Sequence, residues 1–140
     1  MDSAWLAAWS RMQMGTVAII QGQLDRARML LDDSLALSVE AHSTGSVALC
    51  LIAYARLAVA AGDPERAALL VGAAEGLRQR VGLRAWPVLR SGEADLIRQI
   101  RLALGPDRFS EMAQVGSALN RQEAVAAVSD QHRVDMVSPT

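Results

Sequence analysis

The sequence contains no lysine, a single cysteine and only two histidines, and each shortage excludes a class of site. Without lysine the chain cannot form a phosphate-binding loop of the Gly-x-x-x-x-Gly-Lys-Ser/Thr type, because that lysine contacts the phosphates. Because Cys50 is the single cysteine, an internal disulfide and any metal site built from several cysteines are excluded. His42 and His132 lie far apart with no cysteine or second histidine beside them, so we expect no metal site.

An excess of charge and a long apolar run are also missing. The 14 basic residues, all arginine, are balanced by 15 acidic residues, and a net charge of −1 argues against direct nucleic-acid binding. The most apolar run, 47–61, is interrupted by Arg56 and is shorter than the roughly 20 residues that span a bilayer. Asp2 stands where a signal peptide would carry basic residues. We therefore expect a cytoplasmic protein that makes no membrane contact.

Helix-favouring residues dominate what is present. The length of 140 residues predicts one domain, and a hydrophobic content of 51% is enough to fill a core. No convincing alternation of apolar and polar residues indicates a strand. The predicted fold class is therefore all-α, with a single helical domain over 1–129 and a flexible tail over 130–140. The predicted helices span 3–21, 24–41, 44–61, 64–81, 89–104, 107–118 and 121–129.

Short stop and start signals separate these helices. Gly62 can end one helix in the left-handed conformation, Asp63 can cap the next, and Pro64 suits its first turn. Gly105 with Pro106 and Asp107 indicates a similar break, and Ser43 or Thr44 can cap the apolar helix. Asn120 followed by Glu123 has the spacing of a capping box, which predicts one more short helix.

An internal repeat with an offset of 40 residues is the strongest pattern. Gly22, Arg26, Ala27 and Leu30 match Gly62, Arg66, Ala67 and Leu70, and Leu31 aligns with Val71. Each match opens the second helix of a helix–turn–helix pair. A period near 40 is typical of an α-solenoid of the tetratricopeptide or a related type. We expect antiparallel helix pairs over 3–41 and 44–81, stacked as a short solenoid, with additional C-terminal helices over 89–129; an ordinary helical bundle is the alternative.

The segment 62–78 resembles the tetratricopeptide-like C-terminal region of large bacterial regulators. These are LuxR-type or SARP-like transcriptional regulators with a central signalling ATPase. The resemblance covers about residues 15–129 and continues in order through an Arg-rich linker with Pro87, a helix over 93–104, Gly105, the segment 109–116 and the closing segment 120–128. It implies a part that receives signals or partners and restrains the ATPase. No family catalytic residue can be transferred to this chain, and no DNA-reading segment is visible.

Trp5, Trp9 and Met12 are spaced to share one helical face. Such residues are enriched in interface cores, and a terminal repeat needs a polar outer face to be soluble alone. They are therefore candidate interface residues, with a symmetric homodimer as the simplest partner. The alternative is that they pack onto the second helix of the first repeat.

A cluster of arginines surrounds Trp86, with no acidic residue between Glu75 and Glu93. This candidate polar contact patch consists of Arg78, Arg80, Arg84, Trp86 and Arg90. Arginine beside an aromatic ring can bind phosphate or stack on a base. A solvated linker, with arginines at a helix C-terminus, explains the same residues. Gly72 and Gly76, four residues apart on a predicted helix, indicate close helix packing, and Cys50 is expected to be a buried, inert thiol.

No arrangement of residues indicates catalysis. Ser43 and Thr44 adjoin His42, but neighbouring residues do not face one another on a helix. Asp32 and Asp33 are consecutive and point to different sides. We expect no catalytic residues, no cofactor and no enzyme activity. The expected function is a noncatalytic interaction or regulatory module that binds a protein partner, itself or a small effector; a homodimeric small-ligand sensor is the alternative.

Overall fold

The computed structural model describes residues 3–84 and 87–128, and these residues form seven helices and no strand. The helices are α1 (Ser3–Ile20), α2 (Leu24–Glu40), α3 (Thr44–Ala60), α4 (Pro64–Arg80), α5 (Pro87–Leu104), α6 (Pro106–Ser117) and a last helix over 121–128. The all-α prediction is confirmed, and each predicted helix is present. The predicted tail over 130–140 lies outside the described residues. No helix in the described part of the chain has both the length and the apolar character needed to cross a bilayer.

The segment predicted as an Arg-rich linker is partly helical. α5 begins at Pro87 rather than at residue 89, so Arg90 lies within its first turn. Proline suits this place because the first helical residues have no intrahelical acceptor for their N–H groups. For the same reason α6 begins at Pro106, directly after Gly105.

The first four helices follow a period of 20 residues. α1, α2, α3 and α4 end at residues 20, 40, 60 and 80, and each is followed by a turn with one left-handed residue. The left-handed residues are Gly22, His42, Gly62 and Gly82, with φ values of 77°, 54°, 82° and 72°. In every turn the N–H of the third residue after the helix donates back to a carbonyl five residues earlier, as Asp63 does to Ala58 at 2.8 Å. This repeated turn produces the 40-residue repeat.

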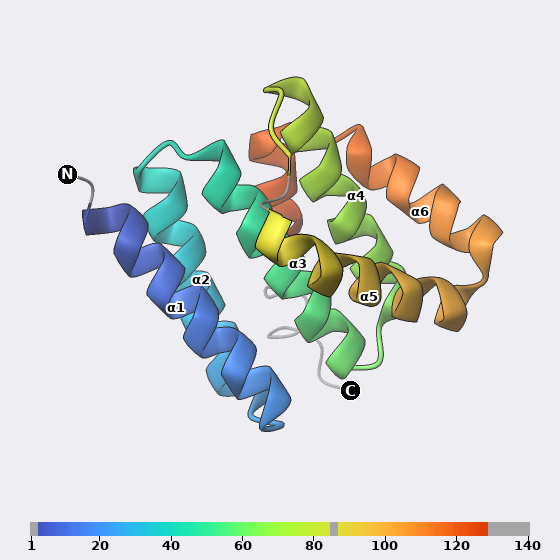
Figure 1. Cartoon of the computed structure of the whole chain (residues 1–140), viewed down its shortest axis with the longest axis horizontal. Helices are drawn as coiled ribbons and strands as arrows, with labels where there is room; N and C mark the ends of the chain where they lie inside the picture. The colour runs from blue at the N-terminus through green and yellow to red at the C-terminus, as the bar shows by residue number, and fades with distance from the viewer. Residues whose placement is uncertain (1–2, 85–86, 129–140) are drawn as a thin grey trace.

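The helices stack as antiparallel pairs at first and then depart from that pattern (Figure 1). α1 packs along α2, and α3 packs along α4, with α3 also contacting α1 and α2. In the third pair, α6 packs far more extensively along α4 than along its neighbour α5. The α5 and α6 helices are therefore splayed apart above α4. The helical-repeat arrangement holds, but its last pair is opened.

Glycine explains why α6 lies so close to α4. A Cβ atom added to Gly72 would overlap the backbone of Ala113, and one added to Gly76 would overlap Ser117. From the other side, a Cβ at Gly116 would overlap the carbonyl of Leu69. The two backbones thus touch along a seam where no side chain fits. The close packing predicted for Gly72 and Gly76 is present, and its partner is α6.

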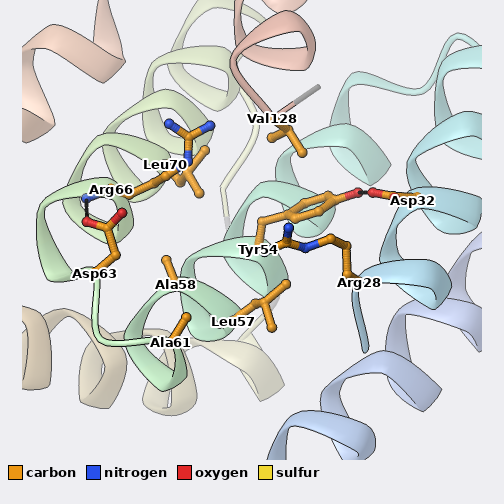
Figure 2. A pocket seen from close by; sticks show the side chains of 10 residues that line it. All are labelled: Arg28, Asp32, Tyr54, Leu57, Ala58, Ala61, Asp63, Arg66, Leu70 and Val128. Carbon is orange, nitrogen blue, oxygen red and sulfur yellow. Dashed lines mark hydrogen bonds between the residues drawn. The ribbon is translucent and has the colours of Figure 1, made fainter. Parts of the chain in front are cut away.

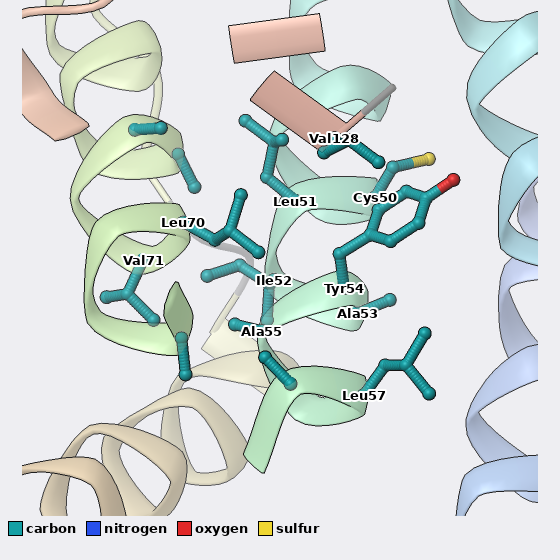
Figure 3. Packing of buried hydrophobic residues seen from close by; sticks show 14 of the residues in the cluster. Cys50, Leu51, Ile52, Ala53, Tyr54, Ala55, Leu57, Leu70, Val71 and Val128 are labelled. Atoms are coloured by element: carbon teal, nitrogen blue, oxygen red, sulfur yellow. The ribbon is translucent and has the colours of Figure 1, made fainter. Parts of the chain in front are cut away.

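The core is centred on α3. Its buried side chains point both toward α4 and toward α2 (Figure 3), and α3 is the helix with the most buried residues. Cys50 lies between the hydroxyls of Ser34 and Ser38 on α2, at 3.3 and 3.6 Å from its sulfur. The Ser34 hydroxyl also donates to the Ala8 carbonyl of α1 at 2.6 Å. These hydroxyls join the first three helices through buried polar contacts that are all satisfied.

The last helix closes the side of the stack between α2 and α4. Asn120 and Glu123 form the predicted capping box, with side chain to backbone distances of 2.8 and 2.9 Å. Ala124 and Val128 are buried in the common core. Arg66 of α4 donates to the carbonyl of Ala127, near the end of this helix. The second repeat therefore helps to hold the C-terminal helix in place.

Candidate functional site

A groove runs along α3, with α1 on one side and the end of α4 and the first part of α5 on the other, and we call it the α3 groove. It contains two adjoining hollows of about 260 and 250 Å³, both lined by Leu49 of α3. Apolar side chains from three of these helices contribute: Trp5 and Met12 from α1, Leu49 and Ile52 from α3, and Leu89 from α5. A shallow and largely apolar channel of this kind suits a helix or an extended segment of another chain.

The charges along the α3 groove are not balanced. Arg56 lines one hollow and Arg84 lines the other, and neither forms an ion pair with a described residue. Among the described residues, the only carboxylate that lines either hollow is that of Glu93. That carboxylate is neutralised by Arg78, so the groove presents net positive charge.

The ion pair of Arg78 and Glu93 connects α4 to α5. The two guanidinium nitrogens of Arg78 donate to the two carboxylate oxygens of Glu93 at 2.8 and 3.0 Å. Only 6% and 11% of the two side chains are exposed. A bidentate pair satisfies both groups at once, which a buried charge requires. The pair therefore positions the start of α5 over α4.

The predicted interface residues are divided between core and groove. Met12 is buried in the core, and Trp9 is half-buried and packs against that core. Trp5 is half-buried and lines the α3 groove. The two indole rings are stacked, with centroids 6.2 Å apart and an angle of 13° between their planes. The outward face of α1 instead exposes other apolar side chains: Leu6, Met14, Val17 and Ile20.

The structure brings only two members of the predicted arginine patch together, because Arg78 and Arg84 line the same hollow of the α3 groove. The charge of Arg78 is neutralised by its buried ion pair with Glu93. Arg80 donates to the carbonyls of Leu119 and Ser117 at 2.7 and 2.5 Å, and so caps the end of α6 rather than its own helix. Arg84 lies on the α3 groove and Arg90 is exposed on α5. Trp86 lies outside the described residues.

A second, larger cavity lies where α5 and α6 are splayed above α4. We call it the α4–α5–α6 cleft, and its volume is about 410 Å³. Its apolar lining includes Val71, Ile97, Phe109 and Ala113. At its mouth the guanidinium carbon of Arg101 lies 4.9 Å from the centre of the Phe109 ring. Such a volume is within the usual range for sites that bind small molecules.

A third cavity, of about 210 Å³, lies beside the last helix (Figure 2). The Tyr54 hydroxyl points from α3 toward α2 and donates to the Asp32 carboxylate at 2.5 Å. Burial, followed by the hydrogen bond and charge of Asp32, raises the pKa of Tyr54 well above its usual range. A tyrosine that keeps its proton so firmly is a structural donor rather than a general base. The Arg28 and Arg66 side chains border the same cavity.

The thiol of Cys50 is likewise unsuited to chemistry. Burial raises its pKa, and the hydrogen bonds with Ser34 and Ser38 only partly offset that effect. A buried thiol held in its protonated form is a poor nucleophile. Among residues 3–84 and 87–128, no group of three or more His, Cys, Asp or Glu residues is placed to hold a metal ion.

Sequence reasoning missed two residues that shape these sites. In the sequence Arg56 only interrupts the apolar run 47–61, and that interruption is the available signal that one side of α3 faces a groove. Glu93 was placed in a helix without a partner. Its pairing with Arg78 depends on how α5 folds back across α4, and no local pattern specifies that.

Comparison with protein-family models, curated proteins and solved structures gives no match, and therefore none that supports the resemblance to LuxR-type or SARP-like regulators.

Proposed function

We propose that the protein is a noncatalytic helical-repeat module that binds a segment of a protein partner in the α3 groove. The observation that carries the proposal is the groove itself, with an apolar floor on α3 and two arginines along it. The proposal keeps the expectations that the protein is cytoplasmic and has no catalytic site. It also keeps a regulatory role like that of the C-terminal region of LuxR-type or SARP-like regulators, where occupancy of the groove would shift the helix pairs.

The lining of the groove defines the chemistry of the partner. Trp5, Leu49 and Leu89 require apolar side chains opposite them, whereas Arg56 and Arg84 favour carboxylates at the rim. An amphipathic helix with one apolar face and acidic flanks satisfies both demands. Complementary charge would speed its association and select against basic segments. The proposed partner is therefore an acidic amphipathic segment.

Two synthetic helical peptides test this proposal. They share one pattern of leucines and differ only in carrying glutamate or lysine at the polar positions. Fluorescence anisotropy should detect binding of the glutamate peptide alone, and raising the salt concentration should weaken that binding. Arg56→Glu should weaken it about tenfold, which corresponds to about 1.4 kcal/mol.

Arg98→Glu is the matched control. Arg98 is exposed on α5, pairs with Asp95 at 2.8 Å and does not line the groove. The control should bind the glutamate peptide as the unmodified protein does. Equal binding of the lysine peptide, or unchanged binding by Arg56→Glu, would contradict the proposed function.

A second copy of the chain is the alternative partner, and the outer face of α1 favours it. Leu6, Val17 and Ile20 are exposed there, Ile20 by 80%, and Arg11 is the only charged residue of α1. An exposed apolar face of this kind promotes self-association. Light scattering after size-exclusion chromatography should then give twice the monomer mass. Leu6→Gln with Val17→Gln should restore the monomer, and a monomer at every concentration of the unmodified protein would reject the homodimer.

A further inference from the structure

We propose that the α4–α5–α6 cleft is a second binding site, which takes a small organic anion with an aromatic body. This inference is independent of the proposed function, because Arg101 of the cleft does not line the α3 groove, and Arg56 and Arg84 of the groove do not line the cleft. The cleft exists because two contacts hold its walls separately. The glycine seam of Gly72, Gly76 and Gly116 holds α6 against α4, and the ion pair of Arg78 and Glu93 holds the first half of α5 against α4. Two walls that are fixed separately leave a slot between them.

The charges of the cleft indicate an anion. Arg78 and Glu93 form its back and neutralise each other. Among the described residues of the lining, Arg101 is then the one cation that forms no ion pair with a described carboxylate. Its guanidinium is held against the Phe109 ring, which leaves its edge available to a carboxylate or sulfonate.

The other end of the cleft orients the ligand. Glu75 lines the cleft next to Gly76, whose backbone faces Ser117, whereas Arg101 lies against Phe109, eight residues earlier on α6. Eight helical residues span about 12 Å. An anionic group is therefore attracted to the Arg101 end and repelled from the Glu75 end. A ligand with a single anionic group and an uncharged remainder fits this polarity.

The walls between those ends indicate an aromatic body. Val71, Ile97 and Ala113 come from three helices that enclose the slot, and the buried Phe109 ring lines it beside them. Flat, apolar rings bury the most surface in such a slot and can pack against the edge or face of Phe109. An aromatic carboxylate or sulfonate combines this body with the required charge.

A matched pair of fluorescent probes tests the site on the full chain. 8-Anilinonaphthalene-1-sulfonate carries the anionic group, and N-phenyl-1-naphthylamine has the same aromatic body without it. Both probes should bind the unmodified protein. Arg101→Gln should weaken binding of the sulfonate probe about tenfold or more, because a charge-assisted contact is lost, and should change binding of the neutral probe less than about twofold.

Occlusion and control variants locate the binding. Ser110 is exposed at the mouth of the cleft, so Ser110→Trp should block entry of both probes without disturbing the fold. Arg98→Gln removes a neighbouring arginine of α5 that does not line the cleft, and it should affect neither probe. Failure of the unmodified protein to bind either probe would overturn the proposal, as would Arg101→Gln binding the sulfonate probe unchanged or Ser110→Trp binding both probes unchanged. Arg56→Glu should leave both probes bound, which separates this site from the α3 groove.

Discussion

The side chains of Arg78 and Glu93 form the wall between the two candidate sites. Arg78 lines one hollow of the α3 groove, Glu93 lines the other, and both line the α4–α5–α6 cleft. Their bidentate contact at 2.8 and 3.0 Å thus holds α5 in place and separates two cavities that would otherwise join.

Breaking this pair on one side should strongly destabilise the fold. Arg78→Met leaves the Glu93 carboxylate buried without a partner, and we expect the free energy of unfolding to fall by about 3–5 kcal/mol. Urea denaturation followed by circular dichroism measures the change. The double variant Arg78→Met with Glu93→Leu should recover much of the loss, because no unpaired charge remains. A double variant as unstable as the single one would contradict this account.

The glycine seam should not tolerate a methyl group. Gly116→Ala places a Cβ into the backbone of α4 at Leu69, and pushing the helices apart should cost about 1–3 kcal/mol or more. Gly92→Ala is the matched control in α5, because the added Cβ would meet only the flexible end of Arg56 at 3.4 Å. The control should be neutral or stabilising by about 0.5–1 kcal/mol. Thermal denaturation compares the two variants. Equal melting temperatures would show that close backbone contact between α4 and α6 does not contribute to stability.

The turn at His42 should be improvable. His42 adopts a φ of 54°, where the equivalent turns have glycine. Since a left-handed conformation strains a residue with a Cβ, His42→Gly should raise the free energy of unfolding by about 1 kcal/mol. Gly62→Ala, in the equivalent turn, should lower it by a similar amount. An unchanged stability of both variants would show that φ does not limit these turns.

Stability at high pH should depend on Tyr54. Its pKa is raised in the folded protein, so the unfolded chain loses this proton first as the pH rises. The contribution of Tyr54 is therefore fully present below about pH 10 and is lost progressively above it. Tyr54→Phe should unfold at lower urea at neutral pH and should show a shallower decline above pH 10. Both proteins retain Cys50, so the difference between their stabilities isolates the tyrosine. Parallel pH profiles would contradict this role.

The parts of the fold that depend on local chemistry were predictable from the sequence. Gly62, Asp63 and Pro64 specify their turn through their own backbone and side-chain preferences, and Asn120 with Glu123 specifies a cap within one helical turn. For this reason the helix limits fall within two residues of those predicted. The 40-residue repeat also follows from local matches, because equal helices and equal turns produce equal spacing.

The arrangement of the third helix pair was not predictable in this way. Gly72 and Gly76 indicate a close neighbour, but nothing near them identifies α6 rather than α5 as that neighbour. Likewise, Arg78 lies in a run of arginines that indicates a solvated segment, and only the path of α5 buries it against Glu93. The cavities are consequences of these distant contacts, so their lining residues had no common sequence signal.

The regular placement of left-handed residues at 22, 42, 62 and 82 also limits how this chain can change in length. One residue added within a helix would rotate everything after it by about 100° and turn the buried face of the next segment outward. A full unit of 40 residues, in contrast, would restore both the rotation and the direction of the chain. The stack can therefore be lengthened or shortened only in whole units, and the surface that it offers to a partner grows in equal steps.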